Sequence, residues 1–203
     1  MQLEQRHIDA LGRAETLMFH SDFCPYLELK ELLADGTPQA RSQFRILFTS
    51  FYGLNAAGLT DNFRDRYFDI LFGVSVEGDG EPNAAAIVER LYDIRNRQGQ
   101  RTLQFSFVSK LVSIHREGRP IYDRHVLKFF HRRDPAERKK SDRISWYVGF
   151  LNDVAANYGA WAQDVRVIPI VDRLKARDER LAGCHVVRLM DFLVWKVGNR
   201  KLL

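Results

Sequence analysis

The stretch that decides the fold runs from residue 103 to residue 130 and reads LQFSFVSKLVSIHREGRPIYDRHVLKFF. Its first half places apolar residues at helical spacing around one lysine, Lys110. A turn containing Gly118 and Pro120 follows. Asp123 then stands at the start of a second apolar segment, where an aspartate is a favoured N-cap. The stretch therefore predicts two helices joined by a short turn.

The rest of the chain repeats this alternation of helix and turn, with little convincing strand. Helical spacing or capping residues predict helices over residues 3–19, 25–34, 38–51, 63–72, 84–97, 144–161 and 178–197. Residues 73–82, rich in glycine, form the clearest loop, and residues 165–171 suit either an extended segment or a broken helix. We expect an all-α fold of roughly nine to ten helices.

Length and composition bound the class of protein. A chain of 203 residues, 45% hydrophobic and 28% charged, suits one globular domain over residues 1–203, and two lobes (1–80 and 81–203) around a cleft are the alternative. Cys24 and Cys184 lie far apart with no partner motif, which favours reduced thiols and a cytoplasmic location. No apolar run is long enough for a membrane-spanning helix, so we expect no membrane partner.

The positive charge of the chain is concentrated in one segment. The formal net charge is +5, and residues 124–143 alone hold eight Lys and Arg against three Asp and Glu. Such clustering is typical of a surface that binds phosphate groups, whereas the alternative is a solvated junction whose charges pair with acids elsewhere. The candidate nucleic-acid-binding residues are Arg124, His125, Lys128, Arg132, Arg133, Lys139 and Lys140.

Several kinds of chemistry have no motif in this chain. It contains no CxxC, HExxH or EF-hand loop, and neither a dinucleotide-binding nor a P-loop glycine motif. The GxSxG motif of hydrolases is also missing. We therefore expect neither a metal ion nor a cofactor.

Residues 121–126, IYDRHV, resemble the catalytic motif of the helix-hairpin-helix superfamily of base-excision DNA glycosylases. In that family a Gly/Pro turn precedes an aspartate at the start of a helix, and bifunctional members carry a nucleophilic lysine on the preceding helix. The resemblance covers residues 105–130. It implies a DNA-repair glycosylase or lyase with Lys110 and Asp123 as catalytic residues.

The implied roles follow from the chemistry. The Lys110 amine would attack a sugar C1′, and Asp123 would orient it or stabilise positive charge developing on the deoxyribose. An extruded base needs an aromatic pocket. The candidates for that pocket are Phe48, Phe51, Tyr52, Tyr122 and Trp146.

A non-catalytic interpretation stands beside this one. Lys110 and Asp123 are thirteen positions apart, closer than the family's lysine and aspartate, and the hairpin region before Lys110 offers only Gly99. A lysine in an apolar helix can extend its amine to the surface, and Asp123 can act as a plain N-cap. The chain would then be a helical nucleic-acid-binding or protein-interaction module that keeps only the scaffold. Both interpretations leave the oligomeric state open.

Overall fold

The computed structural model describes residues 1–74, 83–135 and 139–203, and over these residues the fold is all-helical, with no strand. The described residues form eleven α-helices and one short 3-10 helix: α1 (Gln5–Thr16), α2 (His20–Asp35), α3 (Pro38–Phe51), η1 (Leu54–Ala57), α4 (Asp61–Phe72), α5 (Ala84–Tyr92), α6 (Phe105–His115), α7 (Arg124–Phe129), α8 (Lys140–Trp161), α9 (Ile168–Lys175), α10 (Glu179–Ala182) and α11 (Val186–Arg200). The all-α prediction is confirmed. Most of the loop expected over residues 73–82 lies outside the described residues.

The chain divides into two compact units. Unit 1 combines Met1–Phe23 with Arg116–Leu203, and unit 2 is Cys24–His115. The division expected between residues 80 and 81 is therefore not the one that the structure has. The reason is that α1 packs with helices from the C-terminal end of the chain, a pairing that sequence order does not reveal. The single domain expected over the whole chain stays a prediction.

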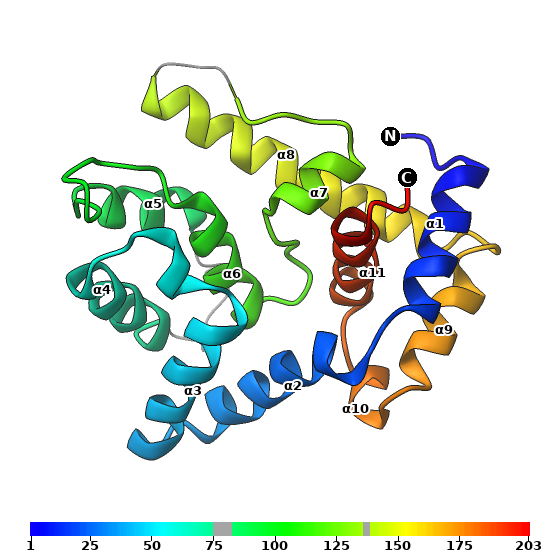
Figure 1. Cartoon of the computed structure of the whole chain (residues 1–203), viewed down its shortest axis with the longest axis horizontal. Helices are drawn as coiled ribbons and strands as arrows, with labels where there is room; N and C mark the ends of the chain where they lie inside the picture. The colour runs from blue at the N-terminus through cyan, green and yellow to red at the C-terminus, as the bar shows by residue number, and fades with distance from the viewer. Residues whose placement is uncertain (75–82, 136–138) are drawn as a thin grey trace. The chain divides into compact units, whose positions relative to one another are not determined.

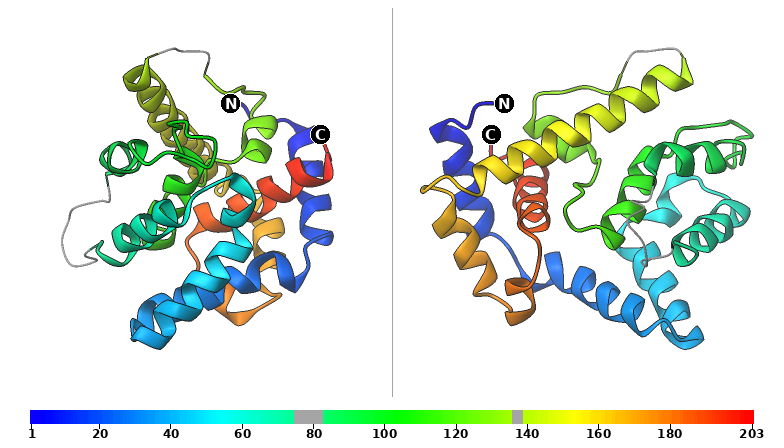
Figure 2. Two further views of the ribbon diagram at one scale, coloured as in Figure 1. Left: turned by 60° about the vertical axis from the view of Figure 1, so that its left-hand side comes forward. Right: turned by 180° about the vertical axis from the view of Figure 1, so that it is seen from behind.

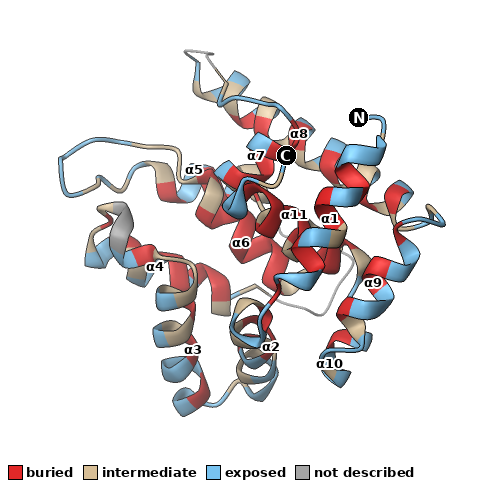
Figure 3. Ribbon diagram, turned by 45° about the vertical axis from the view of Figure 1, so that its right-hand side comes forward, coloured by how far each residue is buried: buried red, intermediate tan, exposed pale blue. Residues whose placement is uncertain are grey.

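Unit 1 is built around α11. This helix packs against α1, α7, α8 and α9, and both views in Figure 2 agree with Figure 1 on its central position among them. Figure 3 shows α11 buried over most of its length. Its apolar side chains account for this position, because each buried aliphatic side chain contributes about 1.5–3 kcal/mol of transfer free energy. They are Val187, Leu189, Met190, Leu193, Val194 and Val197.

Unit 2 has an aromatic core. Phe44, Phe48 and Phe68 pack on one another, with ring centroids 5.3 Å to 6.5 Å apart. Tyr67 stands beside them, fully buried, and its hydroxyl donates a hydrogen bond of 2.8 Å to the carbonyl oxygen of Phe107 on α6. The high phenylalanine content of the chain thus serves core packing in this unit.

Capping residues explain where several helices begin. The Thr37 side chain accepts a hydrogen bond from the Ala40 amide at 3.2 Å, and Pro38 follows in the first turn of α3, as the sequence predicts. Asn83 caps α5 in the same way, through the Ala86 amide at 3.2 Å. Residues 165–167 form a turn, and α9 begins at Ile168 with Pro169 in its first turn, so neither the extended segment nor the broken helix expected over residues 165–171 describes the whole range.

The C-terminal region corrects a prediction made from the sequence. The single helix expected over residues 178–197 is two helices, α10 and α11. α10 ends at Ala182 with Gly183 as its C-cap, and His185 caps α11 by accepting a hydrogen bond from the Val187 amide at 3.2 Å. The His185 amide itself donates to the Glu117 carboxylate at 2.8 Å. Side-chain hydrogen bonds to the backbone therefore replace the helical ladder at this break.

In the part of the chain that the structure describes, no helix is both long and apolar enough to cross a membrane.

Candidate nucleic-acid interface

Asp123 is the N-cap of α7. Its backbone is extended, and its Oδ1 accepts a hydrogen bond of 2.8 Å from the His125 amide. This is the ordinary way in which an aspartate satisfies one of the unpaired amides at a helix start. The predicted capping role of Asp123 is confirmed, while its catalytic role stays a prediction.

α7 presents one side to the core of unit 1. His125, Val126, Leu127 and Phe129 are buried, whereas Arg124 and Lys128 are exposed. The His125 ring packs edge-on against Trp195 of α11, with ring centroids 5.7 Å apart. The sequence groups His125 with the phosphate-binding residues, but its buried position gives it a packing role.

The end of α7 is closed by a Schellman motif. The His131 amide donates to the Lys128 carbonyl oxygen at 3.0 Å, and the Arg132 amide donates to the Leu127 carbonyl oxygen at 2.8 Å. His131 takes the left-handed conformation that this motif requires, with φ of 51°. The chain therefore leaves α7 in a defined direction through a turn at His131, after which Arg132 and Arg133 are exposed and have no regular secondary structure.

The far side of this turn is tied to the core by Tyr122. Its hydroxyl donates a hydrogen bond to Oδ1 of Asp134. The Tyr122 ring is buried against Tyr147 of α8, with ring centroids 4.8 Å apart. Burial raises the pKa of Tyr122 well above its usual value, and the hydrogen bond to Asp134 raises the pKa further. Tyr122 therefore stays protonated and acts as a donor. No local pattern in the sequence indicates this pair.

The cations of the basic segment, residues 124–143, are mostly exposed. Arg124, Lys128, Arg132, Arg133 and Lys139 are exposed, and Lys140 is half-buried. Across residues 1–74, 83–135 and 139–203, no carboxylate forms an ion pair with Lys128, Arg132 or Arg133. Arg138 lies outside those ranges. The guanidinium and ammonium groups of Lys128, Arg132 and Arg133 thus keep hydrogen-bond donors available, whereas Arg124 donates one hydrogen bond of 3.3 Å to His125 Nε2.

Lys110 lies in unit 2, on α6, and only 8% of it is exposed. Its amine donates a hydrogen bond of 3.2 Å to Ser106 Oγ. It also lies 4.9 Å and 5.4 Å from the ring centres of Phe107 and Tyr52. Ring faces attract cations, so these partners suit an ammonium ion. Lys110 and Asp123 belong to different units, and their joint action stays a prediction.

The other pocket candidates are divided between the two units. In unit 2, Phe48 is fully buried and packs on Tyr52, with centroids 4.6 Å apart, and Phe51 also contacts Tyr52. In unit 1, Trp146 is half-buried and stacks on Phe150, with centroids 5.3 Å apart and planes 9° apart. Each of these side chains thus takes part in the packing of its own unit.

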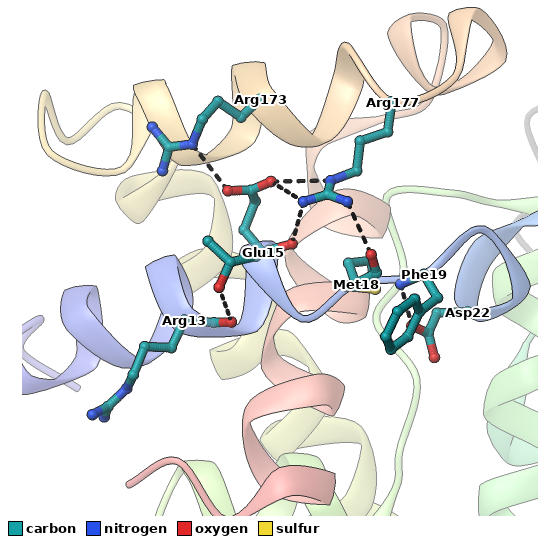
Figure 4. A network of polar contacts seen from close by, with 8 residues as sticks. Arg13, Glu15, Met18, Phe19, Asp22, Arg173 and Arg177 are labelled. Carbon is teal, nitrogen blue, oxygen red and sulfur yellow. Dashed lines mark hydrogen bonds and ion pairs between the residues drawn. The ribbon is translucent and has the colours of Figure 1, made fainter.

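Two ionic networks in unit 1 are absent from the predictions made from the sequence. Glu15 of α1 is buried and accepts hydrogen bonds from Arg173 at 2.9 Å and from Arg177 at 2.6 Å, joining α1 to the region of α9 (Figure 4). In α11, Arg188 is fully buried and donates to Asp191 at 2.7 Å. Opposite charges three positions apart in an apolar helix indicate the second pair, but no local pattern indicates the first.

Asp191 also supports the entry to α7. Its Oδ2 accepts a hydrogen bond of 2.9 Å from the Ile121 amide, and the guanidinium of Arg188 donates to the Arg119 carbonyl oxygen at 3.2 Å. Burial raises the pKa of Asp191 to about 6, although Arg188 and the Ile121 amide act in the opposite direction. Through these contacts the pair fixes the backbone that leads to Tyr122 and Asp123.

The described residues bring together no group of three or more His, Cys, Asp or Glu side chains suited to a metal ion. No family model matches the sequence, and no curated protein or solved structure shows a significant match to it.

Proposed function

We propose that this protein binds DNA through phosphate contacts made by the basic segment. The observation that carries the proposal is the exposed pair Arg132 and Arg133, on a turn fixed at both ends and without a carboxylate partner among the described residues. Guanidinium groups bind phosphate oxygens through two parallel hydrogen bonds, and a fixed turn limits the entropy that binding removes.

Other cations of the basic segment are near this pair in the sequence. Arg124 and Lys128 are exposed four positions apart on α7, so they lie on one side of that helix. Lys139 and Lys140 stand at the start of α8. Contacts of this kind do not distinguish base sequences, because phosphates are the same along the whole duplex. We therefore expect binding that depends strongly on salt and weakly on sequence.

The test measures affinity for a short DNA duplex over a series of salt concentrations. The variant is Arg132→Gln with Arg133→Gln. Its affinity should fall at low salt, because two guanidinium groups no longer neutralise phosphates. The slope of log affinity against log salt should become shallower by about 1 for each phosphate group that the variant no longer binds.

A matched control removes two arginines that already have partners. Arg166 and Arg180 each make a bidentate contact with an aspartate two positions earlier, Asp164 and Asp178. The double variant Arg166→Gln with Arg180→Gln changes the net charge equally but should leave the salt slope almost unchanged. Equal losses in both double variants would show that net charge, and not this segment, causes the binding. Wild-type protein that does not bind DNA at low salt would overturn the proposal.

Glycosylase or lyase activity is the second candidate, and the burial of Lys110 in an apolar helix is the observation that favours it. A lyase forms a Schiff base between an amine and the abasic sugar, and borohydride reduces that adduct to a stable cross-link. Trapping with DNA that carries an abasic site should give a cross-link that Lys110→Ala abolishes. If no cross-link depends on Lys110, the lyase version fails while DNA binding by the basic segment still stands.

A further inference from the structure

The arginine pair lies between two fixed points of the backbone. On one side, the Arg132 amide is held by the Leu127 carbonyl oxygen at 2.8 Å. On the other side, the side chain of Asp134 accepts the hydroxyl hydrogen bond of Tyr122. Only Arg132 and Arg133 lie between these points, so few backbone torsions remain to be fixed when a phosphate binds.

Asp134 has an unusual partner for its position. It follows Arg133 directly, in a segment with an excess of cations, yet the hydrogen bond that the structure gives to its Oδ1 comes from a tyrosine. The hydrogen bond from tyrosine fixes the position of the Asp134 carboxylate and does not use the guanidinium groups of Arg132 and Arg133. Asp134 therefore anchors the turn and leaves both arginines available.

Tyr122 itself is a rigid anchor. Only 6% of it is exposed, and its ring meets Tyr147 and Phe150 edge-on, at 4.8 Å and 6.0 Å between centroids. The amide of Ile121, next to it in the chain, is held by buried Asp191 at 2.9 Å. The ring and the neighbouring backbone are thus both held in the core of unit 1. The hydroxyl hydrogen bond connects this fixed residue to Asp134 at the end of the turn.

We propose that Tyr122 is a positioning residue: its hydrogen bond to Asp134 holds Arg132 and Arg133 in the arrangement that binds DNA phosphates. The inference rests on the proposed function and adds to it that affinity depends on the hydroxyl group of a buried tyrosine. It also gives Asp134 two opposing effects, since its charge repels phosphate while its hydrogen bond fixes the turn.

The experiment compares Tyr122→Phe with wild-type protein in two measurements. The first is hydrogen exchange of the His131 and Arg132 amides, which should become about 10-fold faster as the turn opens more often. The second is affinity for the DNA duplex at low salt, which should fall about 3- to 10-fold because two long side chains must then be ordered on binding. Tyr122→Phe and the wild-type protein have the same net charge, so charge does not account for a difference between them.

A matched control separates this effect from a general loss of stability. Tyr67→Phe also removes a buried tyrosine hydroxyl with a hydrogen bond, but in unit 2. It should lower the stability of the protein and leave both the exchange of the Arg132 amide and the DNA affinity unchanged. Asp134→Asn keeps an acceptor for the Tyr122 hydroxyl and removes a negative charge that repels phosphate. The affinity of this variant for the DNA duplex should therefore rise.

Each outcome decides between the two proposals. Wild-type protein that fails to bind DNA would overturn the proposed function and this inference with it. Wild-type protein that binds, with Tyr122→Phe binding equally well or exchanging at the same rate, would overturn the positioning role alone. An equal loss of affinity in Tyr67→Phe would also overturn it, because reduced stability would then account for the effect.

Discussion

Two residues of the described chain take the left-handed backbone conformation without being glycine. They are His131, with φ of 51°, and Lys201, with φ of 53°. Each stands where a helix of unit 1 ends, α7 and α11. This conformation costs a residue with a Cβ about 1–2 kcal/mol, so the surrounding hydrogen bonds must hold it there.

Glycine at position 131 should therefore stabilise the protein. His131→Gly relieves the strain, and the gain exceeds the added entropy of the unfolded chain, so the free energy of unfolding should rise by about 0.5–1 kcal/mol. Urea denaturation measures the change, and Lys201→Gly should behave in the same way. A fall in stability in His131→Gly alone would mean that the His131 side chain makes a stabilising contact that outweighs the strain.

Glu15 of unit 1 is a buried carboxylate with two arginine partners. Burial by itself raises the pKa of Glu15, but the hydrogen bonds from Arg173 and Arg177 lower it more, so the net pKa lies below the usual value. A carboxylate with a lowered pKa in the folded state contributes stability above its unfolded pKa of about 4.3, and this contribution is lost as pH falls through the folded pKa.

Glu15→Gln should remove that pH dependence. At neutral pH we expect the variant to lose about 1–3 kcal/mol, because a buried charge-assisted network is broken. As the pH falls below about 4.3, the difference between variant and wild type should shrink, since the unfolded wild-type chain binds a proton at Glu15 there while the folded protein does so only at lower pH. Thermal unfolding between about pH 3 and pH 7 measures both effects. A difference that stays constant over this range would contradict the ionic role.

At the scale of elements, the contact between α7 and α11 places the basic segment. Gly198 of α11 lies directly against α7: a Cβ built on it would stand 2.5 Å from the His125 carbonyl oxygen and 2.8 Å from the His125 Cβ. Backbone atoms cannot yield as a flexible side chain can. The first turn of α7, and with it Arg124 and the Asp123 cap, therefore depends on the missing side chain of one glycine.

Gly198→Ala should destabilise the protein by about 1–3 kcal/mol, the usual effect of overpacking. Gly159→Ala in α8 is the matched control, because nothing lies within 4 Å of the Cβ it would add. There alanine should stabilise the helix by up to about 1 kcal/mol. Chemical denaturation measures the free energy of unfolding of both variants. If Gly198→Ala leaves it unchanged, α7 can move away from α11 without a loss of stability.

At the scale of the whole molecule, charge is divided unequally between the units. Unit 1 holds 21 Lys and Arg against 15 Asp and Glu, a net charge of +6, while unit 2 holds 10 against 11, a net charge of −1. The positive excess of the chain thus belongs to the unit that contains the basic segment. A net positive charge of this kind attracts anions at long range.

The way the chain is shared between the units leads to a prediction about unfolding. Helix α2 contributes residues to both units, and unit 1 is assembled from two segments separated by the whole of unit 2. We expect a single cooperative transition, in which Gly198→Ala in unit 1 and Tyr67→Phe in unit 2 lower the same melting temperature. Calorimetry checks this expectation. Two transitions, each shifted by only one of the variants, would show two independent domains.

Much of the fold follows from local patterns. The starts of α3, α4 and α5 follow from Thr37, Thr60 and Asn83, because N-capping depends only on residues within one turn. The start of α7 follows from Asp123 for the same reason. The break between α10 and α11 does not follow from local patterns, because it depends in part on the hydrogen bond from the His185 amide to Glu117, which is distant in sequence.

By itself, the sequence determined the all-helical class, the helix caps and the concentration of cations in residues 124–143, since each depends on neighbours in the chain. Only the tertiary structure decided which of these residues are available. In that structure His125 is buried against Trp195, and Asp134 accepts a hydrogen bond from Tyr122. Arg132 and Arg133 are exposed. The reason is physical: burial and hydrogen-bond partners are set by segments distant in sequence, and no local pattern encodes which of them meet.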